Sequence, residues 1–102
     1  MTDVFGLQPG EIEKIVAVLS TEPAVKEAFI FGSRAKGNYN NGSDVDIALK
    51  GTQLNFDKVI SLSFILNEET LMPYHFDLVH YNTINTPELI DHIDRVGIKI
   101  YG

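Results

Sequence analysis

The sequence predicts an α/β fold in which a mixed sheet of about four strands packs against helices. Two observations support this prediction. Segments with apolar residues at helical spacing alternate along the chain with short apolar segments that are typical of strands. The last of these strands follows only a short helix, so the sheet is expected to be mixed rather than purely parallel.

Individual elements follow from periodicity and from turn signals. Pro9 and Pro87 stand where the first turn of a helix accepts proline, and Thr86 is the expected N-cap of the last helix. A stripe on the third helix is assigned to the core: Phe56, Ile60 and Phe64. Helices are expected at about residues 9–20, 33–36, 54–67 and 87–96, and strands at 24–31, 45–49, 74–80 and 98–101.

Length and composition indicate one small domain, expected to span residues 1–102, with 44% hydrophobic residues. The absence of cysteine excludes disulfides, thiolate zinc sites and a cysteine nucleophile. The net charge of −6 disfavours general binding to nucleic acid, and contact with a polyphosphate would need divalent cations. The sequence contains neither a membrane span of roughly 20 apolar residues nor a signal peptide, so a cytoplasmic location without membrane contact is expected.

Two carboxylates, Asp44 and Asp46, stand two positions apart in a strand pattern and therefore point to the same face. Their repulsion calls for a shared proton or bound cations, and carboxylate oxygens suit Mg²⁺ or Mn²⁺. Two such ions about 4 Å apart are a known device for in-line displacement at phosphorus. Asp77 lies inside a later apolar strand, where a carboxylate is costly unless it is paired or metal-bound. If the two strands are neighbours, Asp77 can ligate metal or act as a general base.

The loop before these carboxylates carries the residues expected to bind nucleotide. Gly32 has no Cβ and lets a phosphate approach the backbone, while Ser33 adds a hydroxyl donor. Arg34 and Lys36 supply two of the chain's eight basic residues. Ser43, which precedes the first carboxylate, is included in the predicted nucleotide site. The glycine spacing fits neither a Walker A loop nor a dinucleotide fingerprint.

The combined pattern resembles a known signature. Gly32-Ser33, ten further residues and then Asp44-x-Asp46 are similar to the motif of the polymerase-β-type nucleotidyltransferase superfamily, and Asp77 fits that family's third carboxylate. The resemblance is closest to the minimal branch, the MNT proteins, and covers about residues 11–101. Lys36 stands where arginine is common, which keeps the charge but loses the planar fork.

The resemblance implies a palm-like nucleotidyltransferase fold and transfer of a nucleoside monophosphate, expected to be AMP from ATP. It implies that Gly32 and Ser33 hold the triphosphate, that Asp44 and Asp46 bind two Mg²⁺ ions, and that Asp77 completes the site. MNT proteins are often paired with helical HEPN proteins. The resemblance therefore implies an antitoxin that adds AMP to a tyrosine of a HEPN-type toxin, with hetero-oligomers or self-association both open.

Two other functions remain open from sequence. The chain could neutralise its partner by stoichiometric contact, with nucleotide binding only vestigial, or it could be the catalytic subunit of a two-chain enzyme that modifies a small molecule. Only the catalytic functions require Asp44 and Asp46. His75 shares the period-2 face of Asp77 and is interpreted as structural, whereas Tyr39 is equally well a base-stacking residue or a loop residue.

Overall fold

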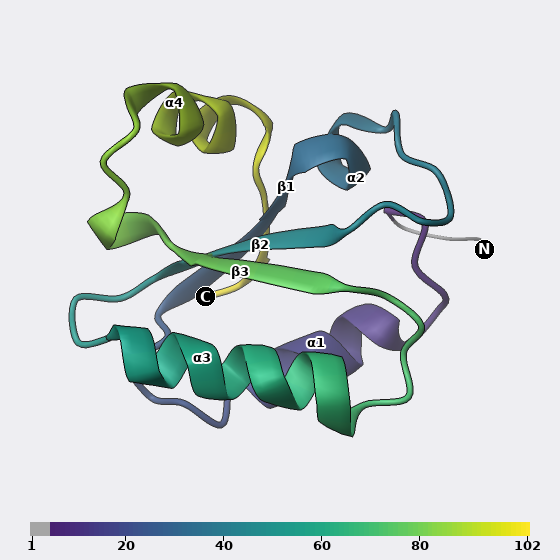
Figure 1. Ribbon diagram of the computed structural model, residues 1–102, viewed down its shortest axis with the longest axis horizontal. Coiled ribbons are helices and arrows are strands. Elements are labelled where there is room, and N and C mark those ends of the chain that lie inside the picture. The colour runs from purple at the N-terminus through teal and green to yellow at the C-terminus, as the bar shows by residue number, and fades with distance from the viewer. Residues whose placement is uncertain (1–4) are drawn as a thin grey trace.

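A four-stranded sheet with helices on both faces forms the computed structural model, which describes residues 5–102 (Figure 1). Helices α1 and α3 cover one face, and α2 and α4 lie on the other. None of the helices within the described residues combines the length and apolar character of a membrane span. The elements in chain order are α1 (Glu11–Leu19), β1 (Glu27–Phe31), α2 (Gly32–Lys36), β2 (Val45–Lys50), α3 (Phe56–Phe64), the π-helical turn η1 (Ile65–Glu69), β3 (Phe76–His80), the 3-10 turn η2 (Tyr81–Thr83), α4 (Pro87–Val96) and β4 (Ile98–Tyr101).

The strand order is β3-β2-β1-β4, and the sheet is mixed, as the sequence predicts. β1 pairs antiparallel with both β2 and β4, while β2 and β3 are parallel. The parallel pair is joined by α3 and η1, which supply the long crossover that parallel neighbours need. β3 is an edge strand next to β2, so the condition under which Asp77 can share a face with Asp44 and Asp46 is met.

The main core lies between the sheet and the α1/α3 layer. Alternate strand residues point into it, and Ile30, Ile47 and Phe76 are at most 1% exposed. From the helices, Ile15 and Leu66 meet them, both fully buried. The other face holds a smaller cluster, in which α4 packs over β1 and β2 through Ile93, Phe31 and Ala48. Most of the apolar surface that stabilises this fold is therefore buried on one face.

Two strands begin later than the sequence suggests. β1 begins at Glu27 rather than residue 24, and β3 at Phe76 rather than residue 74. The third helix continues as a π-helical turn to Glu69, two residues past its expected end. Thr86 occupies the predicted N-cap position of α4, but its side chain makes no capping hydrogen bond.

The core assignment of one stripe on α3 is wrong. Phe56, Ile60 and Phe64 are 76%, 50% and 55% exposed. The helix instead buries Val59 and Leu62, and η1 buries Leu66. Both sets recur at helical spacing, so periodicity alone does not decide between them. The buried set is completed by Leu66 in η1, which extends the same face of the helix over the sheet.

Candidate active site

Three carboxylates are brought to one end of the β2–β3 pair. Asp46 lies in β2 directly opposite Asp77 of β3 in the parallel register. Asp44 precedes β2 by one residue and is exposed, as is Asp77, while Asp46 is half-buried. Flanking residues Val45 and Ile47 are fully buried in the core on the opposite face. The strand alternation therefore separates apolar packing from the acidic group.

Asp46 is the electrostatically strained member of the group. Burial, together with the nearby carboxylates of Asp77 and Asp44, raises the pKa of its carboxyl to about 6. His75 and Arg34 act in the opposite direction. A bound cation is the usual way in which closely spaced carboxylates all remain ionised.

Gly32 fixes the distance between the loop and the carboxylates. Phe31 pairs with Asp46 across β1 and β2, so α2 begins immediately beside that carboxylate. Gly32 has a φ of +75°, and a Cβ at this position would overlap the side chain of Asp46. Both the backbone conformation and the close approach require glycine. Ser33 follows, half-buried, with its carbonyl accepting from the N–H groups of Gly37 and Asn38.

Arg34 is committed to the protein backbone. Its side chain is buried, with Nε and Nη2 donating to the Ser43 carbonyl at 3.2 and 2.8 Å and Nη1 donating to the Phe5 carbonyl at 2.9 Å. The rings of Tyr39 and Tyr74 lie 5.3 and 5.1 Å from the guanidinium. This geometry favours a positioning role, in which Arg34 holds the segment just before the carboxylates, over the phosphate contact expected from sequence.

The remaining predicted nucleotide-site residues lie at the rim. Lys36 is exposed at the last position of α2. Ser43 closes a turn, because its Oγ accepts from the Asn40 N–H at 2.9 Å. His75, interpreted as structural from the sequence, has an exposed ring whose Nδ1 lies 3.5 Å from Asp44 Oδ1.

The donor set suits Mg²⁺ only with help from a substrate. Within residues 5–102, no group of three or more acidic or imidazole side chains is arranged so that it could hold a metal ion by itself. Mg²⁺ usually keeps several waters and binds through one or two carboxylates together with substrate phosphates. The paired carboxylates of Asp46 and Asp77, with Asp44 beside them, fit that kind of open site.

Residues 13–102 match the family described as Polymerase beta, Nucleotidyltransferase. The chain belongs to this family. The match spans the glycine-serine loop and all three carboxylates. No curated protein sequence matches the chain.

Solved structures share the fold of this nucleotidyltransferase-family chain. The crystal structure of a toxin–antitoxin with AMP-PNP is similar with a TM-score of 0.76 and 24% identity, covering 89% of this chain and 73% of that one. The toxin–antitoxin MntA-HepT gives 0.71 and 22%, covering 93% and 73%. A tri-AMPylated Shewanella oneidensis HEPN toxin in complex with MNT antitoxin gives 0.68 and 20%, covering 89% and 69%. At these identities the likeness establishes the fold.

Proposed function

We propose that this chain is a Mg²⁺-dependent nucleotidyltransferase that transfers AMP from ATP to a hydroxyl side chain of a partner protein. The partner is a HEPN-type toxin, and the chain acts as its antitoxin in the cytoplasm. The observation that carries the proposal is the in-register pair Asp46 and Asp77 beside the glycine at position 32. Structural neighbours support the partner, because they include a complex with AMP-PNP and an AMPylated HEPN toxin bound to an MNT antitoxin.

In this proposal each carboxylate has a role. Asp44, Asp46 and Asp77 hold one or two Mg²⁺ ions, for which Mn²⁺ can substitute, and the metal supplies positive charge to the phosphates. Asp77 lies on the edge strand of the sheet and is exposed, so it is the carboxylate best placed to take the proton of an incoming hydroxyl.

The nucleotide occupies the α2 side of the carboxylates. Open backbone at Gly32 and the hydroxyl of Ser33 receive the β- and γ-phosphates, and Lys36 adds charge from the rim. Arg34 and Ser43 position the segment that carries Asp44. The acceptor oxygen loses its proton to Asp77 and forms a bond to the α-phosphorus. The bond from that phosphorus to the bridging oxygen breaks, and pyrophosphate leaves.

Intact-mass spectrometry tests the proposal directly. The chain is mixed with ATP, Mg²⁺ and the product of the neighbouring reading frame, and an Asp44→Asn/Asp46→Asn variant is compared with an Asp91→Asn control. Asp91 is an exposed acid on α4 whose partner is Arg95, so its loss leaves the site intact. We expect the partner to gain one or more AMP units with the wild type and the control only.

Other outcomes assign the competing functions. A partner that binds tightly but keeps its mass with all four NTPs would sink the transfer proposal and favour neutralisation by contact. Nucleotide found on a small molecule, with the partner protein unchanged, would assign the chain to a two-chain enzyme acting on small molecules.

A further inference from the structure

The outer edge of β3 is open. β3 is the terminal strand of the sheet, and residues of a parallel strand direct their backbone groups alternately to either side. The His75 carbonyl accepts from the Val45 N–H at 2.9 Å, so it faces β2. By the same alternation, the N–H and C=O groups of Phe76, Leu78 and His80 point away from β2, off the edge of the sheet.

One side chain already binds this edge as a strand would. Asn67 donates from Nδ2 to the Phe76 carbonyl at 3.0 Å and accepts from the Phe76 N–H through Oδ1 at 2.8 Å. At the other end, the His80 carbonyl accepts from Thr83 Oγ1 at 3.1 Å. Between them, no group within residues 5–102 hydrogen-bonds the outward N–H and C=O of Leu78. The edge thus offers the N–H and C=O of Leu78 to a partner, two residues after those of Phe76, which Asn67 already binds.

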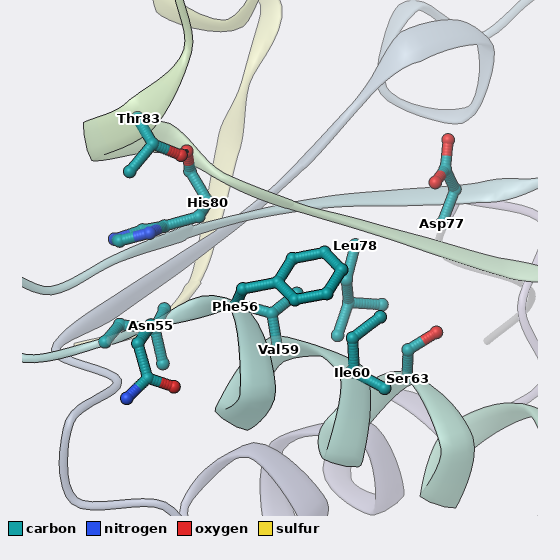
Figure 2. Close-up of a pocket in the computed structure, with 10 residues that line it drawn as sticks. Asn55, Phe56, Val59, Ile60, Ser63, Asp77, Leu78, His80 and Thr83 are labelled. Carbon is teal, nitrogen blue, oxygen red and sulfur yellow. The ribbon is translucent and has the colours of Figure 1, made fainter.

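An apolar groove of about 750 Å³ runs along this edge between β3 and α3. Figure 2 shows Phe56, Ile60 and Ser63 projecting from the helix toward the strand, with the Asp77 carboxylate directed away from that helix. Phe56 and Ile60, two of the three exposed residues that the periodicity assigned to the core, line the helix side of the groove. Exposed apolar side chains gathered beside a free strand edge are typical of an interaction surface.

We propose that this edge and groove bind an extended segment of the partner protein as an added strand, and that this segment carries the acceptor hydroxyl. The inference rests on the proposed function. Leu78 turns its side chain to the groove side, whereas its neighbour Asp77 faces the carboxylate side. A strand paired with Leu78 alternates in the same way, about 4.8 Å away. One of its side chains fills the groove, and the next lies beside Asp77, where the proton must be taken.

Charge specifies the chemistry of the segment. The residues that line the groove include Asp77 and no lysine or arginine. Asp57 is exposed beside Phe56 on α3, Glu68 is exposed on η1, which continues that helix, and the ammonium group of Lys58 is engaged by Glu22 at 3.3 Å. The segment is therefore expected to have apolar residues at alternate positions and basic residues on its flanks.

Two other occupants fit less well. A second copy of this chain would bring its own Asp57, Glu68 and Asp77 against the same charges. A nucleotide would have to cross the edge of the sheet, because α2, where the triphosphate is placed, lies on the opposite face from α3 (Figure 1).

The test combines hydrogen exchange with kinetics. Exchange at the Leu78 amide is followed by mass spectrometry in the wild type alone, with ATP and Mg²⁺, and with the product of the neighbouring reading frame. Transfer kinetics compare Ile60→Glu and Phe56→Glu with Leu71→Glu. Leu71 is fully exposed and does not line the groove, so it is the matched control.

We expect the partner alone to slow exchange at Leu78 at least tenfold. Ile60→Glu and Phe56→Glu should raise the KM for the partner about tenfold while the KM for ATP and the kcat at saturation stay within about twofold. Leu71→Glu should match the wild type. Unchanged exchange together with an unchanged KM in both groove variants would overturn the docking site while leaving AMP transfer intact.

The two proposals fail in different ways. Protection of Leu78 by the partner without any transfer leaves the docking surface standing and removes the enzymatic function. Protection by ATP alone, or protection that grows with the concentration of this chain alone, assigns the edge to nucleotide or to a second copy and overturns the inference. A partner that neither binds nor is modified would overturn both.

Discussion

The two faces of the sheet are built from the same strands but differ in character: one is apolar and buried, and the other carries paired carboxylates. On the α1/α3 face, Ile30, Ile47 and Phe76 are at most 1% exposed and meet other apolar side chains. One residue along β2 and β3, Asp46 and Asp77 stand side by side on the other face. The first face stabilises the fold, whereas the second holds the charged carboxyl of Asp46 near other carboxylates, which destabilises the folded state. Because the two faces alternate with the two-residue period, one strand pair supplies both the buried core and the acidic group.

The largest effect expected from this comparison is on stability. Ile47→Ala removes a fully buried side chain from the main core and should lower the free energy of unfolding by about 2–5 kcal/mol. Ile98→Ala, at a position that is 44% exposed on β4, should lower it by less than about 1 kcal/mol. Urea unfolding measures both. Equal losses would mean that the α1/α3 face does not dominate the stability.

Relations between residues that are close in the sequence can be predicted from spacing alone. The Asp44–Asp46 relation follows from strand alternation, and Gly32 follows from its place between a strand and a helix. The juxtaposition of Asp46 with Asp77 was conditional, because strand order is a property of the whole topology. Once β2 and β3 are parallel neighbours, the register places the two carboxylates together.

Contacts between residues far apart in the sequence could not be predicted from residue spacing. Arg34 binds the carbonyl of Phe5, 29 residues away, and nothing local distinguishes that partner from a phosphate. Asn67 caps the edge of β3 through its amide, a contact that requires η1 and β3 to be already in place. Periodicity on α3 gave two candidate faces, and only the position of the sheet decides which is buried.

The second prediction concerns Arg34→Lys. Arg34 is a buried residue that holds the segment just before the carboxylates. Lysine cannot reproduce the fork that joins the Ser43 and Phe5 carbonyls, so the free energy of unfolding should fall by about 1–3 kcal/mol. Lys36→Met, at an exposed position, should change it by less than about 0.5 kcal/mol. Unchanged stability of Arg34→Lys with a sharply raised KM for ATP would restore the phosphate contact that the sequence suggested.

The smallest expected effect is the loss of folding stability caused by the charged carboxyl of Asp46. The pKa of Asp46 is raised to about 6 from an ordinary value of 3.8, so the folded chain binds this proton more tightly than the unfolded chain. Protonation therefore favours folding. The cost of the charged carboxyl is absent below about pH 4, grows as the pH rises through 6, and is constant above that. Asp46→Asn should remove this pH-dependent cost.

Thermal melting from pH 4 to pH 8 without divalent metal measures this cost as the difference between wild type and Asp46→Asn. We expect equal Tm values at pH 4 and a higher Tm for the variant at pH 8, by no more than about 5 °C, because the carboxyl is only half-buried and solvent still screens its charge. Carboxylates far from Asp46 contribute equally to both proteins and cancel, so the difference reports Asp46 together with its coupling to Asp77 and Asp44. Mg²⁺ with ATP at pH 8 should then raise the Tm of the wild type and leave the variant little changed, since ligands that bind only the folded state stabilise it by mass action. A difference between the two proteins that is the same at every pH would show that Asp46 is not the strained member of the acidic group.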